Sequence, residues 1–460
     1  MTNKQNNRKS EILYFLFATL IFFAFSFNND FILAPDSYSF LENSISRPMG
    51  YSIFLDLFEF LFRENYLITI RIFQLLFLSF SIVYYVSMIS KLFELNKTSQ
   101  ILLLVGLIIV NILPALFSDT GILMYNAIVT EGLVYPLLLI IFANMIRAII
   151  NSSITLMNKS LPLILLTMMI KSQYTYLLIF FFIAYIYVSI ICKKLSLKII
   201  FRAFLIILCV YFINFITLRI YNLYQHGYFV ESQLPTSTLT GKLLFLGDID
   251  DINENDFTEY EYNILHKTFE ESNRRNLTSN SLDNSIGLFD LYSHYEKNYD
   301  IIYHRIYKKY FIENRNELTY NPDDYIELEK FSGDLNKILI RGNLAEYCKL
   351  TFVSAIIALI RANSIYLGSQ FDYQIYLTAF SLIAYIVSFY LIYIYRSNKK
   401  LTRFSFFVYI FLMGNAAPSI LVHYPLSRYI IVTLPLFYTM IFLYLIQFHV
   451  KFIKNRINVN

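Results

Sequence analysis

Charged side chains gather in the first polar segment of the chain, between two apolar blocks. Asp36 and Tyr38 follow the block 12–27, and Arg47 leads through Pro48-Met49-Gly50-Tyr51 into a second apolar stretch. A carboxylate within reach of a hydroxyl can remove its proton, and a guanidinium can hold a phosphate. Structural interpretations remain open: Asp36 could cap a helix, and Arg47 could anchor at lipid head groups.

Three further charged residues stand at the ends of apolar blocks: Glu131, Lys171 and Arg428. A charge at mid-bilayer costs roughly 2.5–3.5 kcal/mol, which favours a functional or paired role for Lys171; at the membrane surface that argument vanishes. Glu131 could bind a substrate, cap the following helix or pair with Arg71. Arg428 precedes Tyr429, a pair that is also typical of an ordinary aromatic belt at the membrane surface.

The sequence gives little support to a metal, nucleotide or nucleic-acid site. Its histidines lack the spacing of a helical metal pair, so surface positions are the expected reading for His226, His266, His294 and His304. The acids around Asp250 lack the glycine and distal glutamate of a calcium loop. We find no glycine-rich phosphate loop, and the net charge of +5 comes from scattered bases rather than a nucleic-acid patch. A divalent metal is therefore possible but unsupported.

The composition predicts a membrane protein. The chain is 57% hydrophobic and 15% charged, whereas soluble domains carry roughly a quarter charged residues. Its apolar residues form blocks without a polar face, as membrane helices do. We expect an all-α polytopic fold with about ten to eleven membrane helices, near residues 12–27, 66–90, 101–117, 129–147, 161–170, 173–191, 200–218, 375–395, 404–422 and 429–448.

Two of the apolar blocks need separate treatment. The block 161–170 is too short to cross alone, and it reads as a half-helix turning at Lys171-Ser172-Gln173. If the block 347–366 crossed the membrane, the basic residues of 396–403 would lie outside the cytoplasm, against the positive-inside rule. We therefore interpret this block as an interfacial or re-entrant helix.

Lysine and arginine positions predict the orientation. Bases recur on alternate connections and at both termini, which should therefore lie in the cytoplasm, with a bacterial inner membrane as the expected location. The opposite side then holds the first polar segment and the long segment 219–345. In that segment about 21 acids face about 13 bases, a charge balance unlike the rest of the chain. We expect three regions: membrane helices in 1–218, an extracytoplasmic and mostly helical domain in 219–345, and interfacial and membrane helices in 346–460.

Three short motifs carry a family resemblance. They are Asp36-Ser37-Tyr38 with Ser46-Arg47-Pro48-Met49-Gly50-Tyr51, then Thr130-Glu131, and finally Ser427-Arg428-Tyr429. Their order and common side resemble the GT-C class of polyprenyl-phosphate-dependent membrane glycosyltransferases, which includes the protein O-mannosyltransferases and the lipid A aminoarabinose transferase. Many members have two adjacent acids in the first loop. Asp36 stands alone here, which leaves the need for a second carboxylate or a metal open.

The resemblance implies transfer of a sugar from a polyprenyl-phosphate donor to a glycan or lipid acceptor at the membrane. It implies Asp36 as the base, Arg428, Lys171, Arg47 and Tyr429 as donor-phosphate ligands, and Glu131 and Tyr38 as substrate contacts. Two other classes remain open. A surface-polysaccharide polymerase would place paired arginines in outer loops, and Arg274-Arg275 is the one such pair. A flippase or transporter would place charges within several spans and show repeat symmetry.

Overall fold

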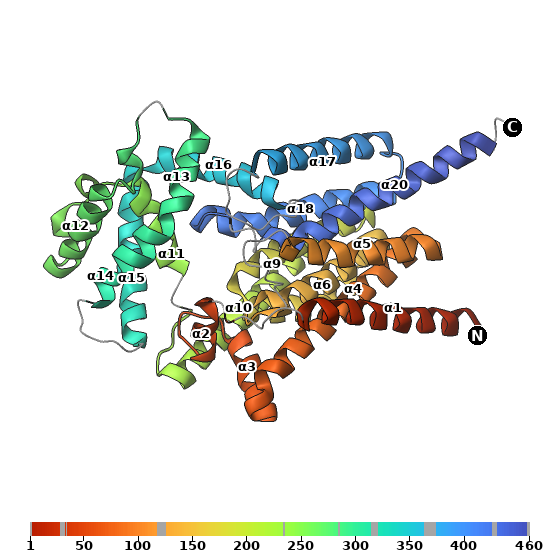
Figure 1. Ribbon diagram of the computed structural model, residues 1–460, viewed down its shortest axis with the longest axis horizontal. Coiled ribbons are helices and arrows are strands. Elements are labelled where there is room, and N and C mark those ends of the chain that lie inside the picture. The colour runs from red at the N-terminus through yellow and green to blue at the C-terminus, as the bar shows by residue number, and fades with distance from the viewer. Residues whose placement is uncertain are drawn as a thin grey trace.

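The computed structural model describes residues 2–27, 33, 35–116, 126–232, 235–283, 286–313, 321–362, 374–425 and 430–457. These residues fold into helices, with no β-strand among them. Figure 1 shows two parts along the long axis, a bundle of apolar helices and a cluster of polar helices. Helix α1 begins and α20 ends at the end of the molecule that lies away from the polar cluster.

The apolar bundle contains long helices and a few short ones, and it includes both the first and the last helix of the chain. Its members are α1 (Thr2–Phe27), α3 (Met49–Phe62), α4 (Tyr66–Phe93), α5 (Lys97–Leu116), α6 (Glu131–Ile150), α7 (Ile154–Asn158), α8 (Leu161–Ile170), α9 (Tyr176–Ile191), α10 (Leu197–His226), α17 (Gln374–Ile394), α18 (Lys399–Val422) and α20 (Leu434–Ile457). Short 3₁₀ turns occupy Arg63–Asn65, Ser172–Thr175 and Ile431–Thr433.

Six helical segments are long and apolar enough to cross a membrane, as a polytopic α-helical membrane protein requires; they lie in α1, α3–α4, α6, α9, α10 and α18. Four other apolar segments have 10–17 residues. The full helices α5, α17 and α20 have 20, 21 and 24 residues, and about 20 residues match the roughly 30 Å hydrocarbon core. The described residues thus contain six candidate spans, or seven if Pro322–Gly342 and Leu344–Ala362 together form one bent span, and the ten to eleven expected from the sequence stay a prediction.

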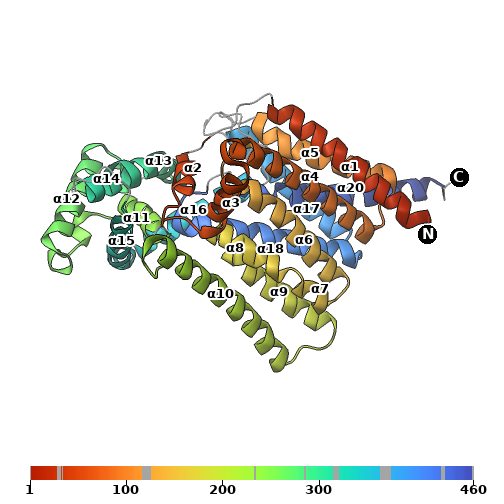
Figure 2. The same ribbon diagram turned by 90° about the horizontal axis from the view of Figure 1, so that it is seen from below.

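Burial differs sharply between helices of the bundle. In the most apolar 18-residue stretch of α6, 78% of the residues are buried, because α4, α8, α9 and α18 pack around this helix. In the corresponding stretch of α10 only 11% are buried, and α10 exposes large side chains such as Phe201, Phe204 and Phe212. Figure 2 shows α10 along one edge of the bundle. So much exposed apolar surface is unfavourable in water, and a lipid surrounding removes the cost.

The polar helices form a second core. They are α11 (Pro235–Leu246), α12 (Glu259–Arg274), α13 (Leu288–Asp300), a π-helix over Ile301–Tyr307, α14 (Lys308–Glu313) and α15 (Pro322–Gly342). Leu265, Tyr303 and Leu335 are among its buried residues. Two of its helices begin at side-chain caps: Thr258 and Glu261 form a capping box at the start of α12, and the Asn321 side chain caps α15. We call this unit the polar domain.

The boundaries of the polar domain differ from those expected. Helix α10 continues past residue 218 to His226 and ends at Gly227, whose φ of 83° suits a glycine C-cap. Helix α16 (Leu344–Ala362) buries Leu350 in the polar-domain core and Ala358 in the bundle core. It meets α15 at 97°. One continuous helix thus joins the two cores, a connection that a boundary at 345 does not capture.

Lys242 is a second link between the polar domain and the bundle. It is fully buried in α11 and donates hydrogen bonds to Thr351 Oγ1 at 2.8 Å and to the Ile420 carbonyl of α18 at 2.9 Å. Burial lowers the pKa of Lys242 to about 7. The site accepts a neutral amine more readily than an ammonium ion.

A pH dependence of stability follows from Lys242. The unfolded chain, with an ordinary lysine pKa near 10.4, binds more protons than the folded chain between pH 7 and about 10. The Lys242 contribution to stability therefore rises with pH across this window. We expect Lys242→Met to reduce the gain in melting temperature between pH 7 and pH 9.5, relative to the wild type. Exposed Lys337→Met is the control, and equal pH slopes for both variants would contradict the burial of Lys242.

Candidate active site

The first loop places Asp36 and Arg47 against each other. Asp36 is the second residue of α2 (Pro35–Leu41), within its first turn rather than at its cap. Arg47 donates to Asp36 Oδ1 at 2.8 Å and to Ser39 Oγ at 2.8 Å. Both charged side chains are less than one-third exposed. The arginine therefore orients the carboxylate, a role that neither the phosphate-binding nor the lipid-anchor interpretation of Arg47 included.

Gly50 explains why this loop lies where it does. A Cβ at Gly50 would approach Met169 C to 2.7 Å and Ile170 N to 2.8 Å, both in the backbone of α8. Helix α3 therefore packs directly on the end of α8, beside Lys171. The glycine of the Arg-Pro-Met-Gly motif brings the first loop to the α8–α9 connection.

Gly50→Ala is expected to destabilise the protein by about 1–3 kcal/mol, because the added methyl group meets backbone that cannot rotate away. Thermal unfolding of the purified protein in detergent measures the loss. Gly106→Ala is the matched control, since a Cβ at Gly106 meets nothing within 4 Å. An equal melting temperature for both variants would contradict the close approach of α3 to α8.

Glu131 and Lys171 form a buried ion pair. Lys171 Nζ lies 2.9 Å from Glu131 Oε1, and the two side chains are 15% and 3% exposed. Thr130 donates to the other glutamate oxygen at 3.0 Å. Helix α8 ends at Ile170, and Lys171 is extended before the 3₁₀ turn, so the predicted turn at 171–173 is confirmed. Glu131 therefore forms an ion pair, as one of the interpretations expected, but its partner here is Lys171, which the sequence did not suggest.

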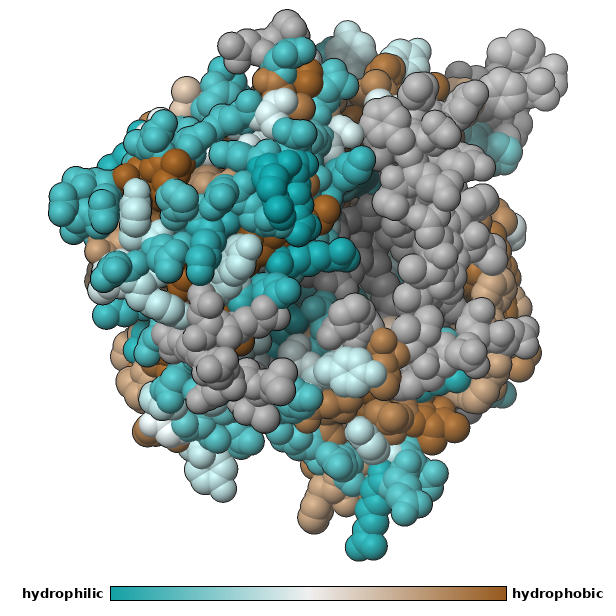
Figure 3. All heavy atoms as spheres, turned by 60° about the vertical axis from the view of Figure 1, so that its left-hand side comes forward, coloured by the Kyte–Doolittle hydropathy of each residue, from teal (hydrophilic) through white to brown (hydrophobic). Residues whose placement is uncertain are grey.

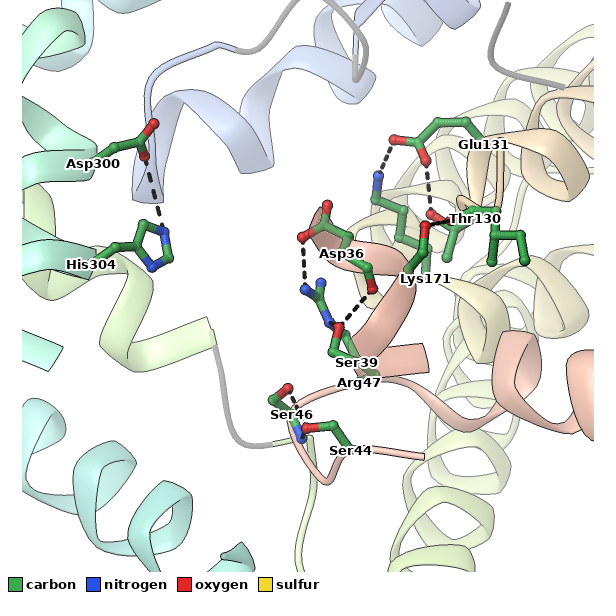
Figure 4. Close-up of polar contacts among 12 residues, drawn as sticks. Asp36, Ser39, Ser44, Ser46, Arg47, Thr130, Glu131, Lys171, Asp300 and His304 are labelled. Carbon is green, nitrogen blue, oxygen red and sulfur yellow. Dashed lines mark hydrogen bonds and ion pairs between the residues drawn. The ribbon is translucent and has the colours of Figure 1, made fainter. Parts of the chain in front are cut away.

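Both ion pairs line one cavity of about 1680 Å³. Figure 4 shows Asp36 between the Glu131–Lys171 pair on one side and Asp300 with His304 on the other. Its membrane end is lined by apolar side chains of α9, α10 and α18, among them Ile183, Leu208 and Met413. Figure 3 shows that the surface of the polar domain is largely hydrophilic. The cavity therefore has an apolar end and a charged end.

The polar domain supplies a wall that the sequence did not single out. His304 is about half exposed, in agreement with the surface position expected of it, and it lines the open cavity together with Asp300, Arg305 and Lys308. His304 Nε2 lies 4.0 Å from Asp300 Oδ1. Burial lowers the pKa of His304; nearby Asp300 and Asp36 oppose this, and Lys308 and Arg47 reinforce it. The signal was the four-residue spacing of 300, 304 and 308, which puts them on one helix face.

Of the remaining candidates, one does not line the cavity and two lie outside the described residues. Tyr38 is 56% exposed and is not among the residues that line the cavity. Arg428 and Tyr429 lie outside the described residues, and so does any contact they make with the cavity. Within the described ranges, no three His, Cys, Asp or Glu side chains lie close enough to hold a metal ion.

The charged end of the cavity thus contains the Asp36 carboxylate held by Arg47, the buried Glu131–Lys171 ion pair, and the cations Arg305 and Lys308. The other end is apolar. Searches against protein-family models, curated proteins and solved structures find no match to this chain.

Proposed function

We propose that the protein transfers a sugar from a polyprenyl-phosphate-linked donor to a glycan or lipid acceptor in the cell envelope. The observation that carries this proposal is the two-ended cavity, with apolar residues of α9, α10 and α18 at one end and charged pairs at the other. A prenyl chain suits the first end, and a sugar phosphate suits the second. The order of the three sequence motifs supports the same class.

The proposed orientation places the polar domain outside the cytoplasm and both termini inside, in a bacterial inner membrane. The alternation of basic connections supports it. The placement of α1 and α20 termini away from the polar domain agrees with it. The first loop, the start of α6, the α8–α9 turn and the end of α18 all line the cavity beside that domain, so a donor head group at the outer surface would meet them together.

At the anomeric carbon of the sugar, the proposed reaction forms one bond and breaks one. The oxygen of the acceptor hydroxyl attacks this carbon while Asp36 accepts the proton of that hydroxyl. The bond from that carbon to the phosphate oxygen breaks, and its electron pair leaves with the lipid phosphate. Lys171 lies where it can approach the departing phosphate, and fixed cations stabilise such charge. Arg47 orients Asp36, while Arg428 and Tyr429 remain proposed donor ligands from the motif alone.

The direct test is transfer of labelled sugar by the full-length protein reconstituted in sealed proteoliposomes. A panel of synthetic prenyl-phosphate sugars serves as donors, and an envelope extract serves as the acceptor. We expect label to appear in the acceptor fraction with release of prenyl phosphate. Movement of intact donor across the bilayer without transfer would indicate a flippase or transporter, and extension of a lipid-linked glycan in place of single-sugar transfer would indicate a polymerase.

The polymerase alternative gains nothing from its one arginine pair. Arg274 and Arg275 both form ion pairs with Glu271 on α12, and they do not line the cavity. A polymerase would need those arginines at the site where the glycan binds, so the transferase is the function that we propose.

A further inference from the structure

One wall of the cavity comes from a single helical stretch of the polar domain. Asp300, His304 and Lys308 follow one another at four-residue intervals, with Arg305 beside them, and all four line the cavity. The stretch is a π-helix from Ile301 to Tyr307. Such segments are rare, and they are frequent at functional sites.

A row of tyrosines lies on the neighbouring face of this stretch. Tyr295, Tyr299, Tyr303 and Tyr307 are buried at the same spacing. The Tyr299 and Tyr303 hydroxyls donate to the Thr238 carbonyl and to Ser237 Oγ, and the Tyr307 hydroxyl shares a hydrogen bond with Ser332 Oγ. An α-helix has 3.6 residues per turn, so a four-residue stripe drifts around its axis. The wider π turn reduces this drift. The tyrosines therefore stay buried along the whole stretch, with Tyr299 and Tyr303 at the edge of the cavity, while the charged stripe lines the cavity.

The charges of the cavity are unevenly balanced. Arg47 is paired with Asp36, and Lys171 with Glu131. Lys308 instead donates to the neutral Tyr325 hydroxyl at 3.1 Å and lies over that ring. Across the described part of the chain, neither Lys308 nor Arg305 forms an ion pair. We define the basic wall as Arg305 and Lys308. Among the described residues, these two positive charges face one carboxylate on the same stretch, Asp300, which lies beside His304 and forms no ion pair with either cation.

We infer that the basic wall binds an anionic group, such as a phosphate, on the acceptor, so that the acceptor is an anionic glycan or glycolipid. This inference rests on the proposed function for the word acceptor. In the proposed reaction the donor enters along the apolar end and brings its phosphate toward Lys171. Asp300 and His304, which belong to the same helical stretch as the basic wall, lie on the far side of Asp36 (Figure 4). A molecule held there presents its hydroxyl to Asp36 from the side opposite the donor. Free cations in a partly enclosed cavity attract and orient anions.

The experiment measures binding without turnover. The full-length protein in neutral-lipid nanodiscs is titrated with fluorescent maltotriose that carries one phosphate, and with the unphosphorylated sugar. We expect tighter binding of the phosphorylated sugar, weakened by salt. Lys308→Gln and Arg305→Gln should each weaken it about tenfold. Lys309→Gln is the matched control, because the same charge is lost one residue away from the cavity lining. Lys308→Arg should retain binding, which separates loss of charge from loss of folding.

Two outcomes overturn the inference. Equal binding of both sugars shows that no anion site is present. Variants at 305 and 308 that weaken binding of prenyl phosphate, while leaving the phosphorylated sugar unaffected, assign the basic wall to the donor. Neither result depends on sugar transfer, so a failed transfer assay with intact phosphate-dependent binding contradicts the proposed function and leaves the anion site standing.

Discussion

Asp36→Asn is expected to lower the rate of sugar transfer by about 10²–10⁴-fold, the range that a general base supplies. The amide keeps the size of the carboxylate and can still accept a hydrogen bond from Arg47, which donates to Oδ1 at 2.8 Å. It cannot accept the acceptor proton. Donor binding, measured with labelled prenyl phosphate, should change little, because the lost function is proton removal.

Glu42→Gln is the matched control for Asp36→Asn. Glu42 lies in the same loop, is exposed and does not line the cavity. We expect wild-type transfer rates from this variant. Full activity of Asp36→Asn would exclude Asp36 as the base, while loss of activity in both variants would indicate a general requirement for negative charge in the loop.

Lys171→Met should destabilise the protein by about 3–5 kcal/mol, because it leaves Glu131 buried without its cation. Glu131 is only 3% exposed although it lines the cavity, so water hydrates its carboxylate poorly. The double variant Glu131→Gln with Lys171→Met should recover a large part of the loss, since no uncompensated buried charge remains. Equilibrium unfolding of the purified protein measures all three variants.

An exposed ion pair provides the comparison for Lys171. Lys349 and Glu346 are 2.6 Å apart and about half exposed, and pairs of this kind contribute about 0–1 kcal/mol. Lys349→Met should therefore change stability little. If Lys171→Met is no more destabilising than Lys349→Met, Glu131 is not held in a dry environment, and the packing of α6 against α8 differs from that described.

Helices were the most predictable part of the fold. The apolar blocks 66–90 and 161–170 became α4 (Tyr66–Phe93) and α8 (Leu161–Ile170), because length and continuous hydrophobicity depend on local sequence. The caps at Thr258 and Asn321 were equally local. The number of membrane-spanning helices was harder to predict from the sequence. An apolar block of about 17 residues can lie at the membrane surface, or it can cross the membrane where the bilayer is locally thin.

The candidate site was predictable only in part. Asp36, Arg47, Glu131 and Lys171 were singled out from charge beside apolar blocks, and the fold gathers all four on one cavity. Their partners were not predictable. Glu131 and Lys171 are 40 positions apart, and they meet because α6 packs on α8. From the sequence alone, Arg71 was an equally reasonable partner for Glu131.

The sequence by itself determined the helical, membrane-type architecture, the polar domain and the residues able to carry charge at its border. These features follow from composition and from periodicity over a few turns. Only the tertiary structure decided that His304, Arg305 and Lys308 face the cavity, that Arg47 orients Asp36 and that α16 joins the two cores. Such relations arise from contacts between segments far apart in the chain. The four-residue spacing of 300, 304 and 308 places these residues on one helix face, but only tertiary packing determines what that face meets.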